Sequence, residues 1–113
     1  GLGVHWATET LVKFPEISAE ILDLRSLNPL DKDAIFAAAN KTGKVIVLHE
    51  DCMTGGIGGE LVALITEHCF ENLDAPVIRV ASLDTPVPFA VTLEKQFLAS
   101  VRLEEAMNRL MTY

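Results

Sequence analysis

The sequence feature that most constrains the fold is an unbroken run of four apolar residues, Val45-Ile46-Val47-Leu48. Such a run is typical of a strand buried on both faces, as in a parallel sheet that is covered by helices. A Gly-rich turn follows at residues 54–59, and residues 60–70 then carry apolar side chains at helical spacing. A strand, a turn and a helix in this order predict an α/β fold with helices on both faces of the sheet.

The same alternation of strands and helices continues along the rest of the chain. We expect strands over residues 19–24, 44–49 and 77–80, and helices over residues 1–14, about 31–40, 60–70 and 101–111. The second helix begins either after Asn28, with Pro29 as its first residue, or after Asp31 as its N-cap. Residues 84–88 contain two prolines and are expected to form a loop. The prediction is a three-layer α/β/α domain over residues 1–113, with a mostly parallel sheet that is short for this architecture.

Length, charge and cysteine content exclude several classes of function. The 113 residues suffice for one domain, and 9 basic against 16 acidic residues leave a net charge of −7. This charge argues against nucleic acid and against membranes as partners, and no apolar run approaches the roughly 20 residues of a membrane helix. Cys52 and Cys69 lack the spacing of a zinc site. We therefore expect free thiols and a cytoplasmic protein.

The Gly-rich turn lies after a strand and before a helix, where phosphate groups bind in many α/β proteins. Its sequence, however, has Leu61 where the dinucleotide fingerprint requires glycine, and it lacks the ending of a phosphate-binding loop. Glu60 would also bring negative charge into the first helical turn, where a carboxylate stabilises the helix itself. These features favour a structural turn, and an anion-binding α/β module remains the alternative.

His49, Glu50 and Asp51 lie at the carboxyl end of the buried strand, the edge that faces the ligand crevice in open α/β sheets. Neighbouring residues of a strand point to opposite faces, so His49 and Glu50 are poorly placed to act on one substrate atom. We expect Glu50 to pack at a domain or subunit contact. The residues alone predict no catalytic, cofactor-binding or metal-binding site.

Several motifs in order resemble the C-terminal domain of transketolase-type enzymes, and in particular the beta subunit of the thiamine-diphosphate-dependent 2-oxoacid dehydrogenases. They are DLRSLNPLD at 23–31, KTGK at 41–44, HE at 49–50, TGG at 54–56 with Glu60, LDAP at 73–76 with RV at 79–80, and DTPVP at 84–88. Residues 49–73 look closer to the branched-chain (2-oxoisovalerate) enzyme than to the pyruvate enzyme. A pyruvate dehydrogenase or another transketolase-type enzyme stays as an alternative.

The resemblance implies that this chain is a scaffold domain and a fragment of a larger oxidoreductase, inactive on its own. Thiamine diphosphate and magnesium would be bound by the full enzyme and not by this domain alone. The implied partners are a dimer mate, the alpha part of the dehydrogenase, and a lipoyl acyltransferase core that docks through its subunit-binding domain. The expected interface residues are Glu50, Asp51, Thr54, Gly55 and Gly56 at the crevice edge, and Asp74 with Tyr113 as a second patch.

Overall fold

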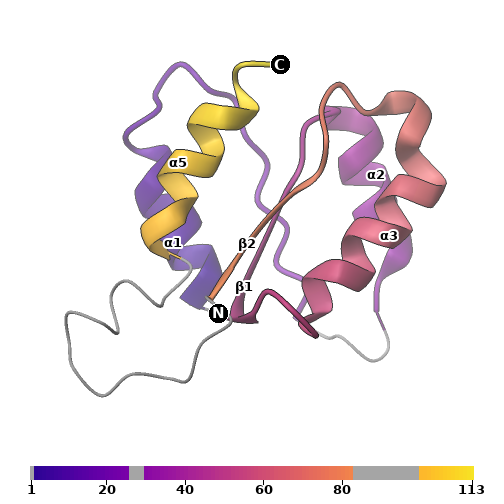
Figure 1. Ribbon diagram of the computed structural model, residues 1–113. Coiled ribbons are helices and arrows are strands. Elements are labelled where there is room, and N and C mark those ends of the chain that lie inside the picture. Colours follow the sequence, from indigo (N-terminus) through magenta and orange to yellow (C-terminus); the bar gives the residue numbers. More distant parts are fainter. Residues whose placement is uncertain (1, 26–29, 83–99) are drawn as a thin grey trace.

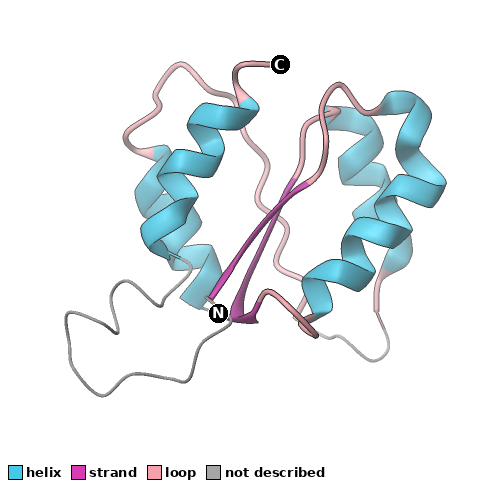
Figure 2. Ribbon diagram, viewed as in Figure 1, coloured by secondary structure: helices cyan, strands magenta, loops and turns pink. Residues whose placement is uncertain are grey.

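Two parallel strands, β1 (Ile46–Cys52) and β2 (Ile78–Ser82), lie between two pairs of helices in the computed structural model (Figure 1). The structure describes residues 2–25, 30–82 and 100–113. Ile46 pairs with Ile78 and Leu48 with Val80. Figure 2 shows helices on either side of the strands, which confirms the predicted α/β class with helices on both faces of a parallel sheet.

The helices α1 (Leu2–Leu11) and α5 (Ser100–Leu110) contact one another and cover one face of the sheet. The buried residues of this layer include Trp6, Leu103 and Met107, which pack with Ile78 and Val80 of β2. The predicted C-terminal helix over residues 101–111 is therefore confirmed, and it buries Leu103, Met107 and Leu110 in this layer.

The helices α2 (Lys32–Thr42) and α3 (Ile57–Cys69) cover the opposite face, and the short 3-10 helix η1 (Phe70–Asn72) follows α3. Val47 of β1 points into this second layer, which contains Ile35, Ala39, Leu61, Ile65 and Cys69. Ile46 and Leu48 pack against the first layer instead. The four-residue apolar run thus serves two cores, because successive strand side chains point to opposite faces.

Local sequence signals account for both ends of α2. The Asp31 carboxylate accepts a hydrogen bond from the Ala34 N–H at 3.1 Å, so Asp31 is the N-cap. At the other end, Gly43 has φ +75° and its N–H donates to the Ala39 carbonyl. Of the two predicted helix starts, the one at Asp31 is confirmed, while Asn28 and Pro29 lie outside the described residues.

The predicted strand over residues 19–24 is wrong. The segment is extended, but it is not a strand, and among the described residues the sheet contains β1 and β2 and no third strand. A strand exists through hydrogen bonds to a neighbour, so an alternating sequence alone cannot create one. Ile21 and Leu22 remain about two-fifths exposed as a result.

The other differences concern element ends. The first helix stops at Leu11 and continues as turns to Phe14, and α3 begins at Ile57 instead of Glu60. The predicted loop at residues 84–88 lies outside the described residues. Across the described ranges, no helix has the length and apolar character needed to cross a bilayer.

Candidate functional site

The turn of residues 53–56 joins β1 to α3 at the carboxyl ends of the strands, the predicted crevice edge. Gly55 adopts φ +78°, a left-handed conformation that most residues avoid. Gly56 is the N-cap of α3 and contributes no side-chain hydrogen bond to the first helical turn. The glycines therefore allow a sharp reversal of the chain between β1 and α3.

Gly58 is required by a close approach between α3 and β1. A Cβ atom at this position would overlap the imidazole ring of His49, whose side chain is half-buried beneath the helix. A Cβ at Gly59 would meet the Arg79 guanidinium at 3.6 Å, an ordinary contact. The Gly-rich turn thus positions His49 against α3, which is a packing role.

Arg79 of β2, the neighbouring strand, contacts the same turn. Its Nη1 atom donates a hydrogen bond to the Met53 carbonyl at 3.3 Å, so one side chain connects β2 to the turn after β1. Sequence reasoning did not single out Arg79 as a site residue. The signal that could have found it is a charged residue between Ile78 and Val80, which are two buried apolar residues of the same strand.

Charges of both signs lie at this edge, since Glu60 and Arg79 are both exposed near the start of α3. Glu60 lies exposed in the first turn of α3, where its carboxylate complements the positive end of the helix dipole. Within the described ranges, no three His, Cys, Asp or Glu side chains come together in a group that could hold a metal ion. The contacts at this edge connect α3, β1 and β2, and they support a packing role.

The predicted crevice residues have different placements. Thr54 and Gly55 are exposed and Gly56 is half-buried, so the turn presents a surface at the end of the sheet. Glu50 and Asp51 belong to the last part of β1, but their side chains lie outside the described residues.

The second predicted patch, Asp74 with Tyr113, lies at the opposite end of the strands, and the Gly43–Lys44 link brings its two members together. The Asp74 N–H donates to the Gly43 carbonyl at 2.7 Å, and the Lys44 ammonium donates to the Tyr113 carbonyl at 2.8 Å. Both Asp74 and Tyr113 are exposed. Figure 1 shows the C-terminus at the end of the molecule where β1 begins. Lys44 therefore partly balances the negative charge of this patch.

Cys69 is a free cysteine, 1% exposed, in the core between α2 and α3. Burial raises the pKa of its thiol, because the apolar surroundings disfavour the thiolate. The expected free thiol is confirmed for Cys69, and the Cys52 side chain lies outside the described residues.

The comparisons with known proteins agree on one family. The family described as "Transketolase, C-terminal domain" matches residues 4–102. The 2-oxoisovalerate dehydrogenase subunit beta of Bacillus subtilis is 46% identical over 114 residues, which cover 97% of this chain and 35% of that protein.

Two further relatives match over shorter stretches. The 2-oxoisovalerate dehydrogenase subunit beta of Pseudomonas aeruginosa is 51% identical over 66% of this chain and 21% of that protein. The pyruvate dehydrogenase E1 component subunit beta of Porphyra purpurea is 50% identical over 67% of this chain and 23% of that protein. The chain thus spans about a third or less of the length of these relatives.

Proposed function

The chain belongs to the transketolase C-terminal domain family, and we propose that it is the C-terminal domain of the beta subunit of a branched-chain 2-oxoacid dehydrogenase. The observation that carries the proposal is 46% identity to a 2-oxoisovalerate dehydrogenase subunit beta over 97% of this chain. A pyruvate dehydrogenase is the second candidate, because a pyruvate dehydrogenase subunit beta is 50% identical over 67% of the chain.

In this proposal the domain is a scaffold, and the full enzyme binds thiamine diphosphate and magnesium elsewhere. In the full enzyme, thiamine diphosphate would supply the nucleophilic and electron-accepting chemistry that decarboxylation of a 2-oxoacid needs. The described residues do not fit this group, since Glu60 occupies the first turn of α3 and the described side chains form no metal-binding cluster. The contribution of this chain is therefore the placement of neighbouring domains and subunits.

The two ends of the strands are the proposed contact surfaces. The crevice edge, with Thr54, Gly55 and Gly56 exposed or half-buried, suits a contact with the dimer mate or the alpha part. The patch around Asp74 and Tyr113 suits the subunit-binding domain of the acyltransferase core, whose basic surface would be attracted by an acidic chain. At each of the two surfaces, a hydrogen bond from Arg79 or Lys44 connects separate segments of the chain.

The substrate assignment is tested on the full enzyme that contains this chain. Steady-state oxidation of 2-oxoisovalerate and of pyruvate would be measured with the alpha and beta parts together and an artificial electron acceptor. We expect kcat/KM to be at least about tenfold higher for 2-oxoisovalerate, a difference of ~1.4 kcal/mol in transition-state binding. A higher value for pyruvate would support the second candidate, and no activity with either would overturn the dehydrogenase proposal.

The docking assignment is tested by charge reversal at each end of the strands. Asp74→Lys should weaken binding of the acyltransferase subunit-binding domain about fivefold, chiefly through slower association at low salt. Glu60→Lys, at the crevice edge, is the matched control and should leave this affinity unchanged. Equal affinities for the two variants would remove Asp74 from the docking surface.

A further inference from the structure

Arg79 places a positive charge at the crevice edge of a chain that is acidic as a whole. Its neighbours in β2, Ile78 and Val80, are 7% and 2% exposed, whereas Arg79 itself is exposed. The chain carries 9 basic and 16 acidic residues. None of the ion pairs between described residues includes Arg79. Within the described part of the chain, this guanidinium therefore has no carboxylate partner.

The side chain of Arg79 is held along the start of α3. Its Cδ atom lies 3.6 Å from the position of a Cβ at Gly58, and its Nη1 atom lies 3.6 Å from the position of a Cβ at Gly59. Nη1 also donates to the Met53 carbonyl at 3.3 Å. Because the side chain is already held in place, it loses less conformational entropy on binding a partner than a mobile arginine would.

The hydrogen bond to Met53 leaves most of the guanidinium available for binding. A guanidinium has five N–H groups, and the bond to the Met53 carbonyl uses one of them. The planar fork that remains matches the two oxygens of a carboxylate, which it can bind through two parallel hydrogen bonds. Arginine is also enriched among the residues that contribute most to binding at protein interfaces. These properties favour a carboxylate as the group that Arg79 binds.

The net charge of the chain bears on which subunit supplies this carboxylate. A second copy of the chain could offer Glu60, which is exposed at the same edge. Each copy, however, carries a net charge of −7, so two copies repel one another. Glu60 also lies in the first turn of α3, where it complements the helix dipole of its own chain. A subunit of different sequence is therefore favoured over a second copy.

We propose that Arg79 binds a carboxylate of the alpha part of the enzyme and so contributes to the contact between the crevice edge and that subunit. This inference rests on the proposed function, which makes the crevice edge a subunit contact. The Met53 carbonyl and the start of α3 hold the guanidinium in position. Thr54 and Gly55, which follow Met53 in the same turn, are exposed and belong to the same contact.

The test uses the full enzyme, with the alpha and beta parts together. Arg79→Met removes the charge and keeps most of the apolar stem, whereas Arg79→Lys keeps the charge and removes the planar fork. Arg109→Met is the matched control, at an exposed arginine near the end of α5. Glu60→Gln tests the second copy as the partner. The Kd of the alpha part for the beta part, and that of two beta parts for one another, are measured by dilution of fluorescently labelled subunits at two salt concentrations.

We expect Arg79→Met to raise the Kd between the alpha and beta parts about tenfold and Arg79→Lys about threefold, with Arg109→Met and Glu60→Gln within about twofold of the unsubstituted enzyme. Salt should weaken the unsubstituted enzyme more than Arg79→Met, because the variant lacks the ion pair. A purely structural role of Arg79 would leave this salt dependence unchanged. If Arg79→Met does not fold, Arg79→Lys decides by itself.

Three results would overturn the proposal. The first is an unchanged Kd between the alpha and beta parts in both Arg79 variants. The second is an equal salt dependence of Arg79→Met and the unsubstituted enzyme. The third is weaker association of two beta parts in both Arg79→Met and Glu60→Gln, because a second copy would then be the partner. Oxidation of 2-oxoisovalerate by the unsubstituted enzyme tests the proposed function separately, so this contact can fail while the proposed function stands.

Discussion

Replacing Gly43 by alanine tests how the end of α2 is joined to the Asp74 patch. Gly43 has φ +75°, and a Cβ there would overlap the Asp74 carboxylate and lie 3.1 Å from the Asn72 carbonyl oxygen. Gly55 offers a matched control, because its φ is +78° but nothing lies within 4 Å of the position of its Cβ. The two substitutions share the backbone strain and differ in crowding.

The expected magnitudes follow from this difference. A left-handed conformation costs an L-residue about 1–2 kcal/mol. Alanine also lowers the conformational entropy of the unfolded chain, which offsets part of this cost, so Gly55→Ala should destabilise the protein by ~1 kcal/mol. Gly43→Ala adds the displacement of Asp74 and the weakening of its 2.7 Å N–H bond to the Gly43 carbonyl. A net hydrogen bond contributes ~1 kcal/mol, so the total should be about 2–3 kcal/mol.

Equilibrium urea unfolding, followed by the fluorescence of the single tryptophan, Trp6, measures these free energies. Asp74→Ala by itself should change stability by less than about 0.5 kcal/mol, since its side chain is exposed. When Asp74→Ala is combined with Gly43→Ala, it should restore about 1 kcal/mol of the free energy of unfolding that Gly43→Ala loses. This difference is the coupling energy between the two sites. Equal losses for Gly43→Ala and Gly55→Ala, or zero coupling, would refute the reasoning.

Three further substitutions test the core, the helix cap and the buried thiol. Ile65→Ala, at a side chain that is 2% exposed, should cost about 2–4 kcal/mol in urea unfolding, whereas a loss under 1 kcal/mol would contradict its place in the core. Asp31→Ala should cost ~1 kcal/mol and Asp31→Asn much less, because asparagine can still cap; equal losses would exclude the capping role. Burial raises the pKa of the Cys69 thiol in the folded protein. The stabilisation linked to this protonated thiol is complete below the thiol pKa of the unfolded chain, and it is lost as the pH rises through the pKa of the folded protein. The free energy of unfolding of Cys69→Ala should therefore fall less at alkaline pH than that of the unsubstituted protein. An equal fall in both proteins would show that other groups cause the loss of stability.

Local chemistry made several elements predictable. Asp31 and Gly43 bound α2 because a carboxylate cap and a left-handed glycine act through their immediate neighbours. The apolar run at residues 45–48 indicated a strand between two helical layers, and the structure divides its side chains between two cores. The same local rule predicted a strand at residues 19–24, where it failed because pairing depends on a neighbour distant in sequence.

The candidate site was less predictable for the same reason. The glycines of the turn are visible in the sequence, but their purpose depends on His49 and Arg79, which approach from two different strands. Asp74 and Tyr113 are 39 positions apart, and they share a patch because Gly43 and Lys44 each bind one of them.

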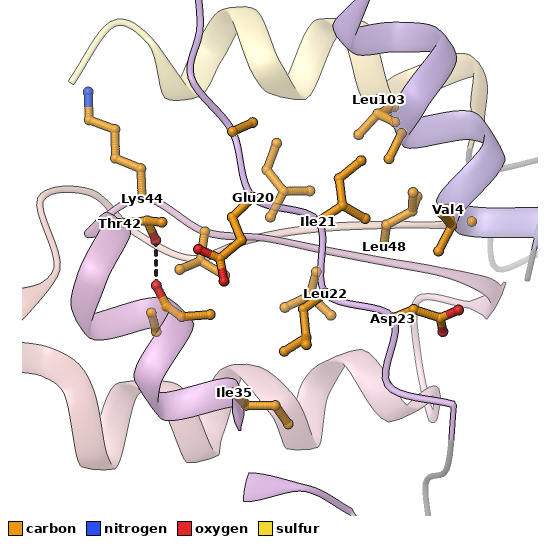
Figure 3. A pocket seen from close by; sticks show the side chains of 18 of the residues that line it. Val4, Glu20, Ile21, Leu22, Asp23, Ile35, Thr42, Lys44, Leu48 and Leu103 are labelled. Atoms are coloured by element: carbon orange, nitrogen blue, oxygen red, sulfur yellow. Dashed lines mark hydrogen bonds between the residues drawn. The ribbon is translucent and has the colours of Figure 1, made fainter. Parts of the chain in front are cut away.

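The sequence by itself determined the α/β class, the order of helices and strands over most of the chain, and the caps of α2, since hydrophobic periodicity and capping act over a few residues. The tertiary structure alone decided that Gly58 makes room for His49 and that Arg79 donates a hydrogen bond to the turn after β1. It also decided that residues 19–24 lie across a cavity from β1 (Figure 3). The physical reason is that these features are contacts between separate elements. Their energies depend on how sheet and helices pack in space, which no short stretch of sequence encodes.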